Sequence, residues 1–397
     1  MISVSEALAI IATHRPQMIE VITPLADSLG AVAARDITAQ MTLPPRDVSA
    51  MDGYAAGHSD AKTKGAALIV IGESAAGNPF GGPIKAGECV RIFTGAIVPQ
   101  GADTIIIQEN VTRDADFITC TQDQAAPRHI RKAGQDFSAG DILVKAGAPI
   151  GPSEIALIAA GNHAAVPTRR RPIVAILANG DELKAPGSVL AEGQIVSSNS
   201  AALAALITQW GGEPLLLGIA ADSEAAILEK IALAKTADII VPVGGASVGD
   251  HDHMRAAFTS AGLEMHFAKI AVKPGKPTWF GALGAQCVLG LPGNPASAIV
   301  CAHLFLKPLM GRDNIEGRAK LTAPISKNGP RETYQRARLS IGDDCSLIVT
   351  PFPRQDSALI TPLTLSNALI KVPPHDGPWQ IGDSIEVVSL GIGPHIL

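Results

Sequence analysis

Four short loops between residues 179 and 297 carry the residue types that bind anions and cations. Their sequences are Asn-Gly-Asp-Glu at 179–182, Gly-Gly-Ala-Ser-Val-Gly-Asp at 244–250, Lys-Pro-Gly-Lys-Pro at 273–277 and Leu-Pro-Gly-Asn-Pro at 291–295. Glycines let backbone N–H groups approach an anion closely, and a helix N-terminus favours negative charge. Lysines neutralise phosphate or an oxyanion, and carboxylates hold divalent cations. The loops therefore predict an anion site with cation ligands beside it.

Each loop on its own also has an ordinary structural interpretation. Glycine and acidic residues at 179–182 are typical of turns and helix caps. The glycines at 244–250 can serve a tight strand-to-helix turn alone. A lysine pair such as Lys273 and Lys276 is often a solvated surface, and Asp222 can simply cap its own helix. The four loops together are more informative than any one of them.

The elements that must position these loops lie between Pro172 and Pro308. Apolar strand-like runs such as PIVAILA and DIIVPV alternate there with helical segments such as SNSAALAALITQW. This alternation predicts a doubly wound parallel sheet, because right-handed crossovers make successive strands point the same way. Loops at the carboxyl ends of such strands meet at one edge, where ligands bind. We therefore expect the four loops to lie together, with Asp222 and Asp252 adding carboxylates.

The rest of the chain predicts β-rich domains on either side of this α/β domain. Short strands separated by glycine and proline turns occupy 45–137, and alternating stretches at 313–397 predict a small β-barrel-like domain. Residues 1–44 and 138–171 are expected to form one split linker domain, whose first helix begins with a capping box at Ser3 and Glu6. The predicted fold class is multidomain α/β plus β, with the central doubly wound α/β domain at 172–312.

Composition narrows the functional classes. The net charge of -5 argues against a general nucleic-acid binder, which would carry a broad basic surface. Five widely spaced cysteines without a CxxC pair predict reduced thiols rather than a disulfide framework or a zinc cluster. The start MISVSEALAI lacks a basic n-region, and the apolar stretch 297–306 is interrupted by His303. We expect a cytoplasmic protein that binds neither membranes nor nucleic acid.

Six segments in a fixed order resemble one known family. They are SAMDGYA, RIFTGAIVPQGAD, GDEL, GGASVGDHD, KPGKP and LPGNPASA, and they are similar to segments of the molybdopterin molybdotransferase family, which includes the C-terminal domain of gephyrin. The match spans most of the chain, and a tail with Gln355, Ser357 and Asn367 is compatible with it. Two departures are Ala178 and Asn179, where the family usually has Ser or Thr before Gly-Asp-Glu, and Ser197, where an acidic residue commonly precedes Ser-Asn.

The resemblance implies an activity and an assembly. It implies an L-shaped homodimer of four-domain subunits, with the active site between the α/β domain of one subunit and the β-rich domain of the other. In the family, adenylylated molybdopterin is hydrolysed with a divalent cation, normally Mg²⁺, while molybdate is transferred to the dithiolene sulfurs and AMP is released. The molybdopterin adenylyltransferase is an expected partner.

The resemblance also implies roles for residues of this chain. Lysines and backbone N–H groups would hold phosphate and molybdate, and carboxylates would hold Mg²⁺. The candidate catalytic residues are Asp52, Thr94, Glu182, Asp222, Asp252, Lys269, Lys273 and Lys276. The candidate substrate-binding residues are Asp136, Gly244, Gly245, Ser247, Gly249, Gly275, Pro292, Gly293, Asn294, Pro295 and Ser297. The candidate metal ligands are Asp181, Glu182, Asp222 and Asp252.

Two other functions stay open on the motifs. A molybdopterin adenylyltransferase or a nucleotide hydrolase shares the GGxSxG loop, yet neither explains SAMDGYA and RIFTGA upstream. A gephyrin-like scaffold is the alternative of another class, and the chain adds no extra domain or long linker of the kind that accompanies that role.

Overall fold

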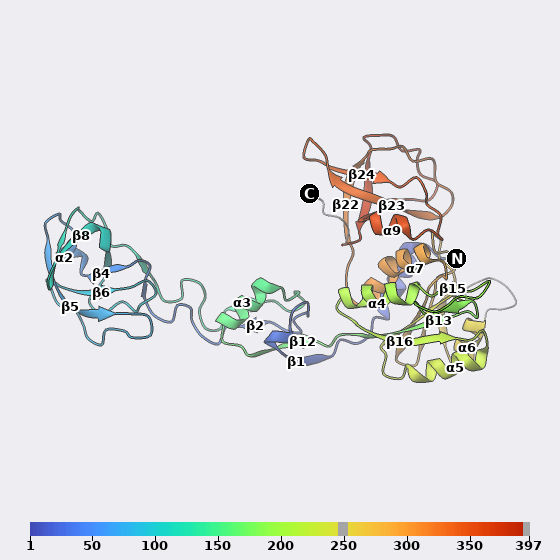
Figure 1. Ribbon diagram of the computed structural model, residues 1–397, viewed down its shortest axis with the longest axis horizontal. Coiled ribbons are helices and arrows are strands. Elements are labelled where there is room, and N and C mark those ends of the chain that lie inside the picture. Colours follow the sequence, from blue (N-terminus) through green and yellow to red (C-terminus); the bar gives the residue numbers. More distant parts are fainter. Residues whose placement is uncertain (245–252, 392–397) are drawn as a thin grey trace. The chain divides into compact units, whose positions relative to one another are not determined.

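The computed structural model describes residues 1–244 and 253–391, and the chain divides into two compact units. One unit contains Met1–Met18 and Arg171–Leu397, and the other contains Ile19–Arg170. Figure 1 labels their helices and strands. No helix within 1–244 or 253–391 has both the length and the apolar character needed to span a membrane.

The Ile19–Arg170 unit contains a β-rich part built on a six-stranded sheet. The strand order is β7-β4-β6-β5-β9-β8, and all neighbours are antiparallel except β5 and β6. The strands are β4 (Gly53–Ala56), β5 (Ala67–Ser74), β6 (Glu88–Ile92), β7 (Thr104–Ile107), β8 (Val111–Asp114) and β9 (Phe117–Cys120). Short helical elements α2 (His58–Ala61) and η2 (Gln108–Asn110) flank them. The prediction of a β-rich region without a long helix is confirmed.

Segments from before and after this sheet pair with each other in the same unit. β1 (Glu20–Pro24) pairs with β12 (Ala165–Arg169), and β2 (Ile37–Thr38) pairs with β11 (Ile142–Val144). β3 (Val48–Ser49) pairs with β10 (Ile130–Arg131), and η1 (Leu25–Asp27) and α3 (Pro152–Ala160) complete the set. A small core of Ile37, Val144, Ile150, Ile158 and Val166 lies between them.

The first helix, α1 (Val4–Thr13), differs from our expectation in where it packs. It begins with the expected capping box, because the Ser3 hydroxyl accepts from the Glu6 N–H and the Glu6 carboxylate accepts from the Ser3 N–H. Its buried face joins the core of the α/β unit rather than the linker segments. The apolar positions predict a buried helix face, but not which core buries it.

The α/β sheet has the order β16-β13-β17-β21-β20-β18. The first four strands are parallel, as predicted, whereas β20 pairs antiparallel with β21 on one side and with β18 on the other. The antiparallel edge was not expected from the alternation, and it arises because a tight turn joins β20 to β21. The strands are β13 (Ile173–Asn179), β16 (Glu213–Ala220), β17 (Ile239–Val243), β18 (Glu264–Phe267), β20 (Trp279–Leu283) and β21 (Gln286–Gly290).

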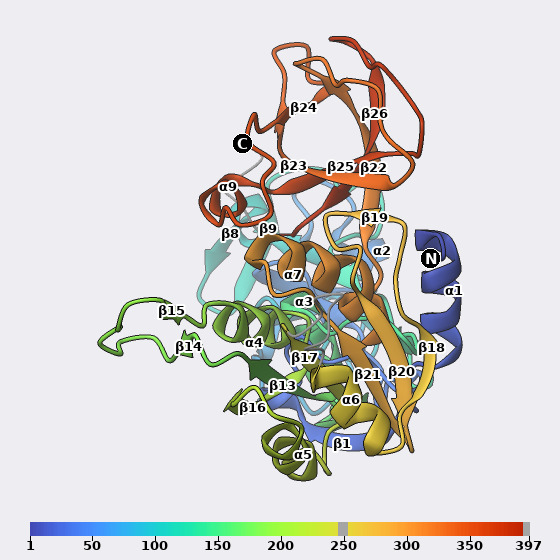
Figure 2. The ribbon, with the colours of Figure 1, turned by 90° about the vertical axis from the view of Figure 1, so that its right-hand side faces the viewer.

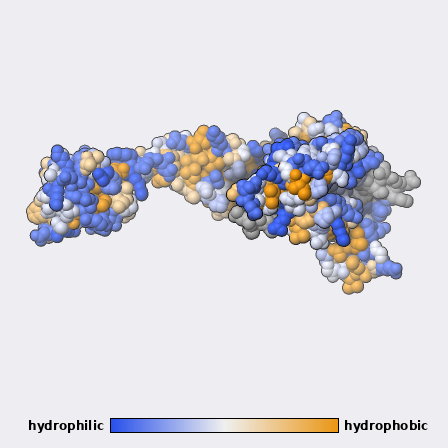
Figure 3. Space-filling model, turned by 90° about the horizontal axis from the view of Figure 1, so that it is seen from above, coloured by the Kyte–Doolittle hydropathy of each residue, from blue (hydrophilic) through white to orange (hydrophobic). Residues whose placement is uncertain are grey.

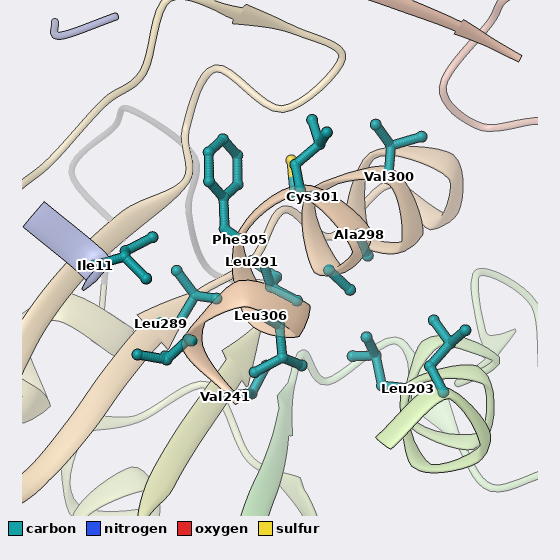
Figure 4. Close-up of a cluster of buried hydrophobic side chains, with 14 of the residues drawn as sticks. Ile11, Leu203, Val241, Leu289, Leu291, Ala298, Val300, Cys301, Phe305 and Leu306 are labelled. Atoms are coloured by element: carbon teal, nitrogen blue, oxygen red, sulfur yellow. The ribbon is translucent and has the colours of Figure 1, made fainter. Parts of the chain in front are cut away.

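Helices cover both faces of this sheet, as Figure 2 shows. One core contains residues of α1, of α4 (Asn199–Gln209) and of α7 (Pro295–Cys301), which continues into η3 (Ala302–Leu306) and α8 (Lys307–Leu309). In Figure 4, Leu203 of α4, Phe305 of η3 and Val241 of β17 belong to that core. The other core contains residues of α5 (Glu224–Leu233) and α6 (His253–Ser260). The doubly wound architecture is therefore confirmed.

A barrel follows the α/β sheet in the same unit. β25 (Ala368–Val372) pairs with both β26 (Ser384–Ser389) and β23 (Glu332–Ile341), which closes a ring through β24 (Leu347–Pro351) and β22 (Ile315–Leu321). β19 (Val272–Lys273) pairs parallel with the start of β23. The other elements are β14 (Leu183–Lys184), β15 (Ile195–Val196) and α9 (Thr361–Leu365).

His303 is expected to make the stability of the α/β unit depend on pH. The side chain is buried in η3 against Trp210, at 5.0 Å between ring centroids, and burial lowers its pKa to about 3 from the ordinary 6.5. Between these values the unfolded chain binds a proton that the folded chain excludes, so the free energy of unfolding falls as pH drops below about 6.5. The expected slope from this residue is about 1.4 kcal/mol per pH unit.

The measurement is denaturant unfolding at several pH values, followed by the fluorescence of Trp210, Trp279 and Trp379, which all lie in this unit. His303→Phe keeps an aromatic ring beside Trp210 and removes the titration. The stability difference between the wild type and the variant should change between pH 7 and pH 5. A difference that is independent of pH contradicts the prediction.

Candidate functional site

A pocket of about 1280 Å³ lies where the carboxyl ends of the parallel strands face the C-terminal barrel. It exceeds the roughly 300–1,000 Å³ of an ordinary small-molecule site. The α/β wall consists of residues 178–179, 182–183, 195–199, 243–244, 273–277, 292–295 and 297. The barrel wall consists of residues 331, 333–335 and 355–358. Of the predicted site residues, the pocket contains Glu182, Gly244, Lys273, Gly275, Lys276, Pro292, Gly293, Asn294, Pro295 and Ser297.

Three of the predicted loops approach each other through their backbones. A Cβ on Gly293 would lie 3.5 Å from the Gly244 Cα, and a Cβ on Gly244 would lie 3.0 Å from the Asn179 carbonyl oxygen. The Asn199 side chain donates to the Gly293 carbonyl oxygen at 2.7 Å and joins α4 to the 291–295 loop. The glycines therefore bring three strand ends together and leave main chain exposed to a ligand.

The lysine loop is held from behind by buried contacts. Lys273 and Lys276 are exposed at the pocket, whereas Gly275 between them is buried against the Cys301 sulfur with φ at +114°. The Thr278 hydroxyl donates to the Gly275 carbonyl oxygen at 2.8 Å. Burial raises the pKa of the Cys301 thiol to about 12, so the thiol is neutral. The two cations thus project from a tightly packed turn.

Lys269 is placed differently from the other two lysines. Its backbone carbonyl accepts from the Ile2 N–H at 3.2 Å. Lys269 is half-buried and does not line the pocket. Its assignment to the site stays a prediction.

The carboxylates are divided between the pocket and a neighbouring turn. Glu182 is exposed and lines the pocket. The Asp181 carboxylate instead accepts from the Asp222 backbone N–H at 3.0 Å, and neither residue lines the pocket. Gly245, Ser247, Gly249 and Asp252 lie outside the described residues. Within 1–244 and 253–391, no three His, Cys, Asp or Glu side chains gather as a metal site.

A second candidate site lies in the Ile19–Arg170 unit. Asp52 precedes β4, Thr94 follows β6, and these strands pair with Gly53 opposite Ile92, so both residues reach the same end of the sheet. The Thr94 N–H and hydroxyl each donate to Oδ1 of Asp52 at 2.8 Å. The hydrogen bonds from the Thr94 backbone N–H and from the Thr94 hydroxyl lower the pKa of Asp52, so its carboxyl group stays an anion. Asp136 is exposed, and its N–H donates to the Leu43 carbonyl oxygen.

The barrel wall of the pocket contains residues that the sequence did not single out. Arg331, Thr333, Tyr334, Gln335 and Asp356 line the pocket beside Gln355 and Ser357. Ser357 connects the barrel to the start of α7 by two hydrogen bonds. Its Oγ accepts from the Asn294 side chain at 2.8 Å, and its carbonyl oxygen accepts from the Ala296 N–H. The only sequence signal was the tail that contains Gln355 and Ser357.

Comparisons with family models match nearly the whole chain. Residues 2–161 match the MoeA N-terminal region (domain I and II), residues 175–312 match a probable molybdopterin binding domain, and residues 318–390 match the MoeA C-terminal region (domain IV).

Individual proteins match over similar lengths. A molybdopterin molybdenumtransferase of Haemophilus influenzae is 33% identical, with 91% of this chain and 92% of that protein covered. A protein with the same description from Bacillus subtilis is 31% identical, with 92% and 89% covered. The crystal structure of a molybdopterin biosynthesis MoeA protein from Pyrococcus horikoshii superposes with a TM-score of 0.85 at 29% identity, with 98% and 99% covered.

Proposed function

Because the chain belongs to the molybdopterin molybdenumtransferase family, which inserts molybdenum during molybdenum cofactor biosynthesis, we propose the following reaction for it. Adenylylated molybdopterin and molybdate are the substrates, the adenylate is hydrolysed with Mg²⁺, and AMP is released as molybdenum joins the dithiolene sulfurs. We place this reaction in the cytoplasm, with the molybdopterin adenylyltransferase as the supplier of the adenylylated substrate.

The observation that carries the proposal is the pairing of two lysines with exposed glycine backbone in one large pocket. Both proposed substrates are anions, and the chain is acidic overall, so an anion needs a local cluster of donors. Lys273 and Lys276 supply positive charge, and the exposed Gly293 presents main chain at the pocket, whereas the Gly244 N–H donates to the Leu291 carbonyl oxygen at 3.3 Å. Donors of these kinds bind phosphate and oxyanions.

The metal ligands are supported less completely than the anion donors. Glu182 is a hard oxygen ligand at the pocket, of the type that Mg²⁺ prefers. Asp181 and Asp222 lie in two neighbouring loops that do not line the pocket, and the Asp181 carboxylate accepts from the Asp222 backbone N–H. Mg²⁺ bound at Glu182 would supply positive charge beside the phosphate of the substrate.

We propose that the Asp52 and Thr94 site acts together with the pocket of a second subunit in a homodimer. The Asp52 carboxylate is anchored through Oδ1, and its second oxygen accepts no hydrogen bond within 1–244 and 253–391, so it is suited to orient a polar reactant. Figure 3 shows apolar side chains gathered over the region that Figure 1 labels α3, β2, β1 and β12, and the exposed large apolar residues of the same segments include Ile22, Leu29 and Ile142. Exposed apolar patches of this kind mark protein interfaces.

The test uses the purified full-length chain with adenylylated molybdopterin, molybdate and Mg²⁺. Release of AMP that depends on molybdate, together with activation of a cofactor-free molybdenum enzyme, is the expected result. AMP no higher than a no-enzyme control refutes the proposal. Formation of adenylylated molybdopterin from molybdopterin and ATP would instead favour the adenylyltransferase alternative, and loss of AMP release in EDTA tests the Mg²⁺ requirement.

Removing the two pocket lysines should weaken substrate binding. Hydrogen bonds to charged groups contribute about 1.5–3 kcal/mol, so we expect Lys273→Met and Lys276→Met each to raise KM for adenylylated molybdopterin by roughly tenfold or more. Steady-state kinetics of AMP release measures this. Lys235→Met, which removes an exposed lysine outside the pocket, is the matched control. Unchanged KM in both pocket variants would contradict the anion-binding role.

A further inference from the structure

Arg91 makes an unusual set of contacts beside the Asp52 and Thr94 site. Its guanidinium lies 4.7 Å from the ring centroid of Phe93 and 5.2 Å from that of Tyr54. Nη1 donates to the Gly53 carbonyl oxygen at 3.0 Å, and Nη2 donates to Oε1 of Gln108 at 2.8 Å. An arginine fixed by two hydrogen bonds and two aromatic rings has little rotational freedom.

These contacts join the three segments that hold Asp52. Gly53 follows Asp52 directly and begins β4. Phe93 directly precedes Thr94, whose N–H and hydroxyl bind the Asp52 carboxylate. Gln108 begins η2, and its backbone N–H donates to the Asp52 carbonyl oxygen at 3.2 Å. Arg91 therefore contacts a neighbour of every group that hydrogen-bonds Asp52.

Main-chain hydrogen bonds shape the backbone of this corner, because the Gly95 N–H donates to the Ser49 carbonyl oxygen at 2.9 Å and the Ala96 N–H donates to the Phe93 carbonyl oxygen at 3.0 Å. A Cβ on Gly53 would clash with the Ile106 backbone, so β4 and β7 are already at their closest approach. Thr94 and Gly95 are exposed beyond the end of β6. The carboxylate at 52 thus sits at a rigid strand end, while its partner Thr94 sits on an exposed turn.

We propose that Arg91 is a positioning residue that holds Thr94 and the 108 turn in register with Asp52. It acts through Asp52 rather than on the substrate. This inference rests on the proposed function for its kinetic consequence, but its structural part can be tested without any activity.

The kinetic test is a double-mutant cycle in the full-length enzyme. Because misplacement of a reacting group by about 1 Å costs on the order of 10²-fold, Arg91→Met should lower kcat roughly tenfold or more with KM nearly unchanged. If Arg91 acts through Asp52, adding Arg91→Met to Asp52→Asn should cause no further loss. Losses that multiply in the double variant would show an independent role and overturn the proposal.

The structural test is hydrogen exchange of the Thr94 amide, which donates to Asp52. Arg91→Met should accelerate exchange at Thr94 while leaving the β8 and β9 peptide unchanged. Arg113→Met is the matched control, because Arg113 lies in the same sheet and donates to the Ala115 carbonyl oxygen at 3.1 Å. Unchanged protection at Thr94 in Arg91→Met, or equal acceleration in the control, would overturn the proposal.

Two further arms keep the result interpretable. Arg91→Lys retains a cation near the rings but cannot donate to Gly53 and Gln108 together, so it should also accelerate exchange at Thr94. This variant serves as the test if Arg91→Met does not fold. Protection at wild-type level in Arg91→Lys overturns the proposal. If the wild-type enzyme does not insert molybdenum, only the proposed function is refuted. The exchange measurement still tests the role of Arg91.

Discussion

Asp52→Asn is expected to slow molybdenum insertion by about two orders of magnitude, the usual loss when one fixed electrostatic group is removed from an active site. The amide can still accept at Oδ1 from the Thr94 N–H and hydroxyl, so local structure should persist. The substitution removes the negative charge and replaces the second carboxylate oxygen by an NH2 group. In the wild type that oxygen accepts no hydrogen bond from the described residues. The measurement is AMP release under single-turnover conditions.

The control for this prediction separates charge from geometry. Thr94→Val removes the hydroxyl donor and keeps both the carboxylate and the backbone N–H bond, so its loss should be clearly smaller. Melting temperatures of both variants should stay close to the wild type, since Asp52 is only partly buried. An Asp52→Asn enzyme that inserts molybdenum at the wild-type rate would remove Asp52 from the mechanism.

Gly275→Ala should both destabilise the α/β unit and impair the lysine loop. A Cβ at this position would overlap the Cys301 sulfur, and the φ of +114° is one that L side chains rarely adopt. Overpacking typically costs about 1–3 kcal/mol and an unfavourable backbone about 1–2 kcal/mol more, so we expect a total of roughly 2–5 kcal/mol. Because the loop carries Lys273 and Lys276, KM for the anionic substrate should rise as well. Denaturant unfolding and AMP-release kinetics measure the two effects.

Two variants test whether the steric contact is the cause. Gly262 also has a large positive φ, at +97°, but a Cβ there would meet nothing within 4 Å, so Gly262→Ala reports a backbone cost without the steric contact. Cys301→Ala removes the atom in the way, so the Gly275→Ala and Cys301→Ala double variant should lose less stability than the sum of the two single variants. Strict additivity would show that Cys301 does not position the loop.

The α/β architecture and the three described loops at its pocket could be predicted from the sequence. Alternating strands and helices between Pro172 and Pro308 have periodicities that each segment carries locally, and crossover handedness then orients the strands. The Ser3 and Glu6 capping box formed as predicted for the same reason, since its partners are three residues apart. The ordered motifs likewise pointed to the family that the comparisons show.

Contacts between segments far apart in the chain could not be predicted in this way. Nothing local to α1 indicates that it packs on the α/β core, and nothing in β23 indicates that its barrel supplies Arg331 and Gln335 to the pocket. The contact of Arg91 with the Tyr54 ring depends likewise on the pairing of β4 with β6. Short-range patterns specify an element and its buried face, but the partner of that face depends on packing among residues far apart in the chain. The lysines and glycines were therefore predictable from sequence, whereas the barrel wall and the surroundings of Asp52 emerged only from the folded chain.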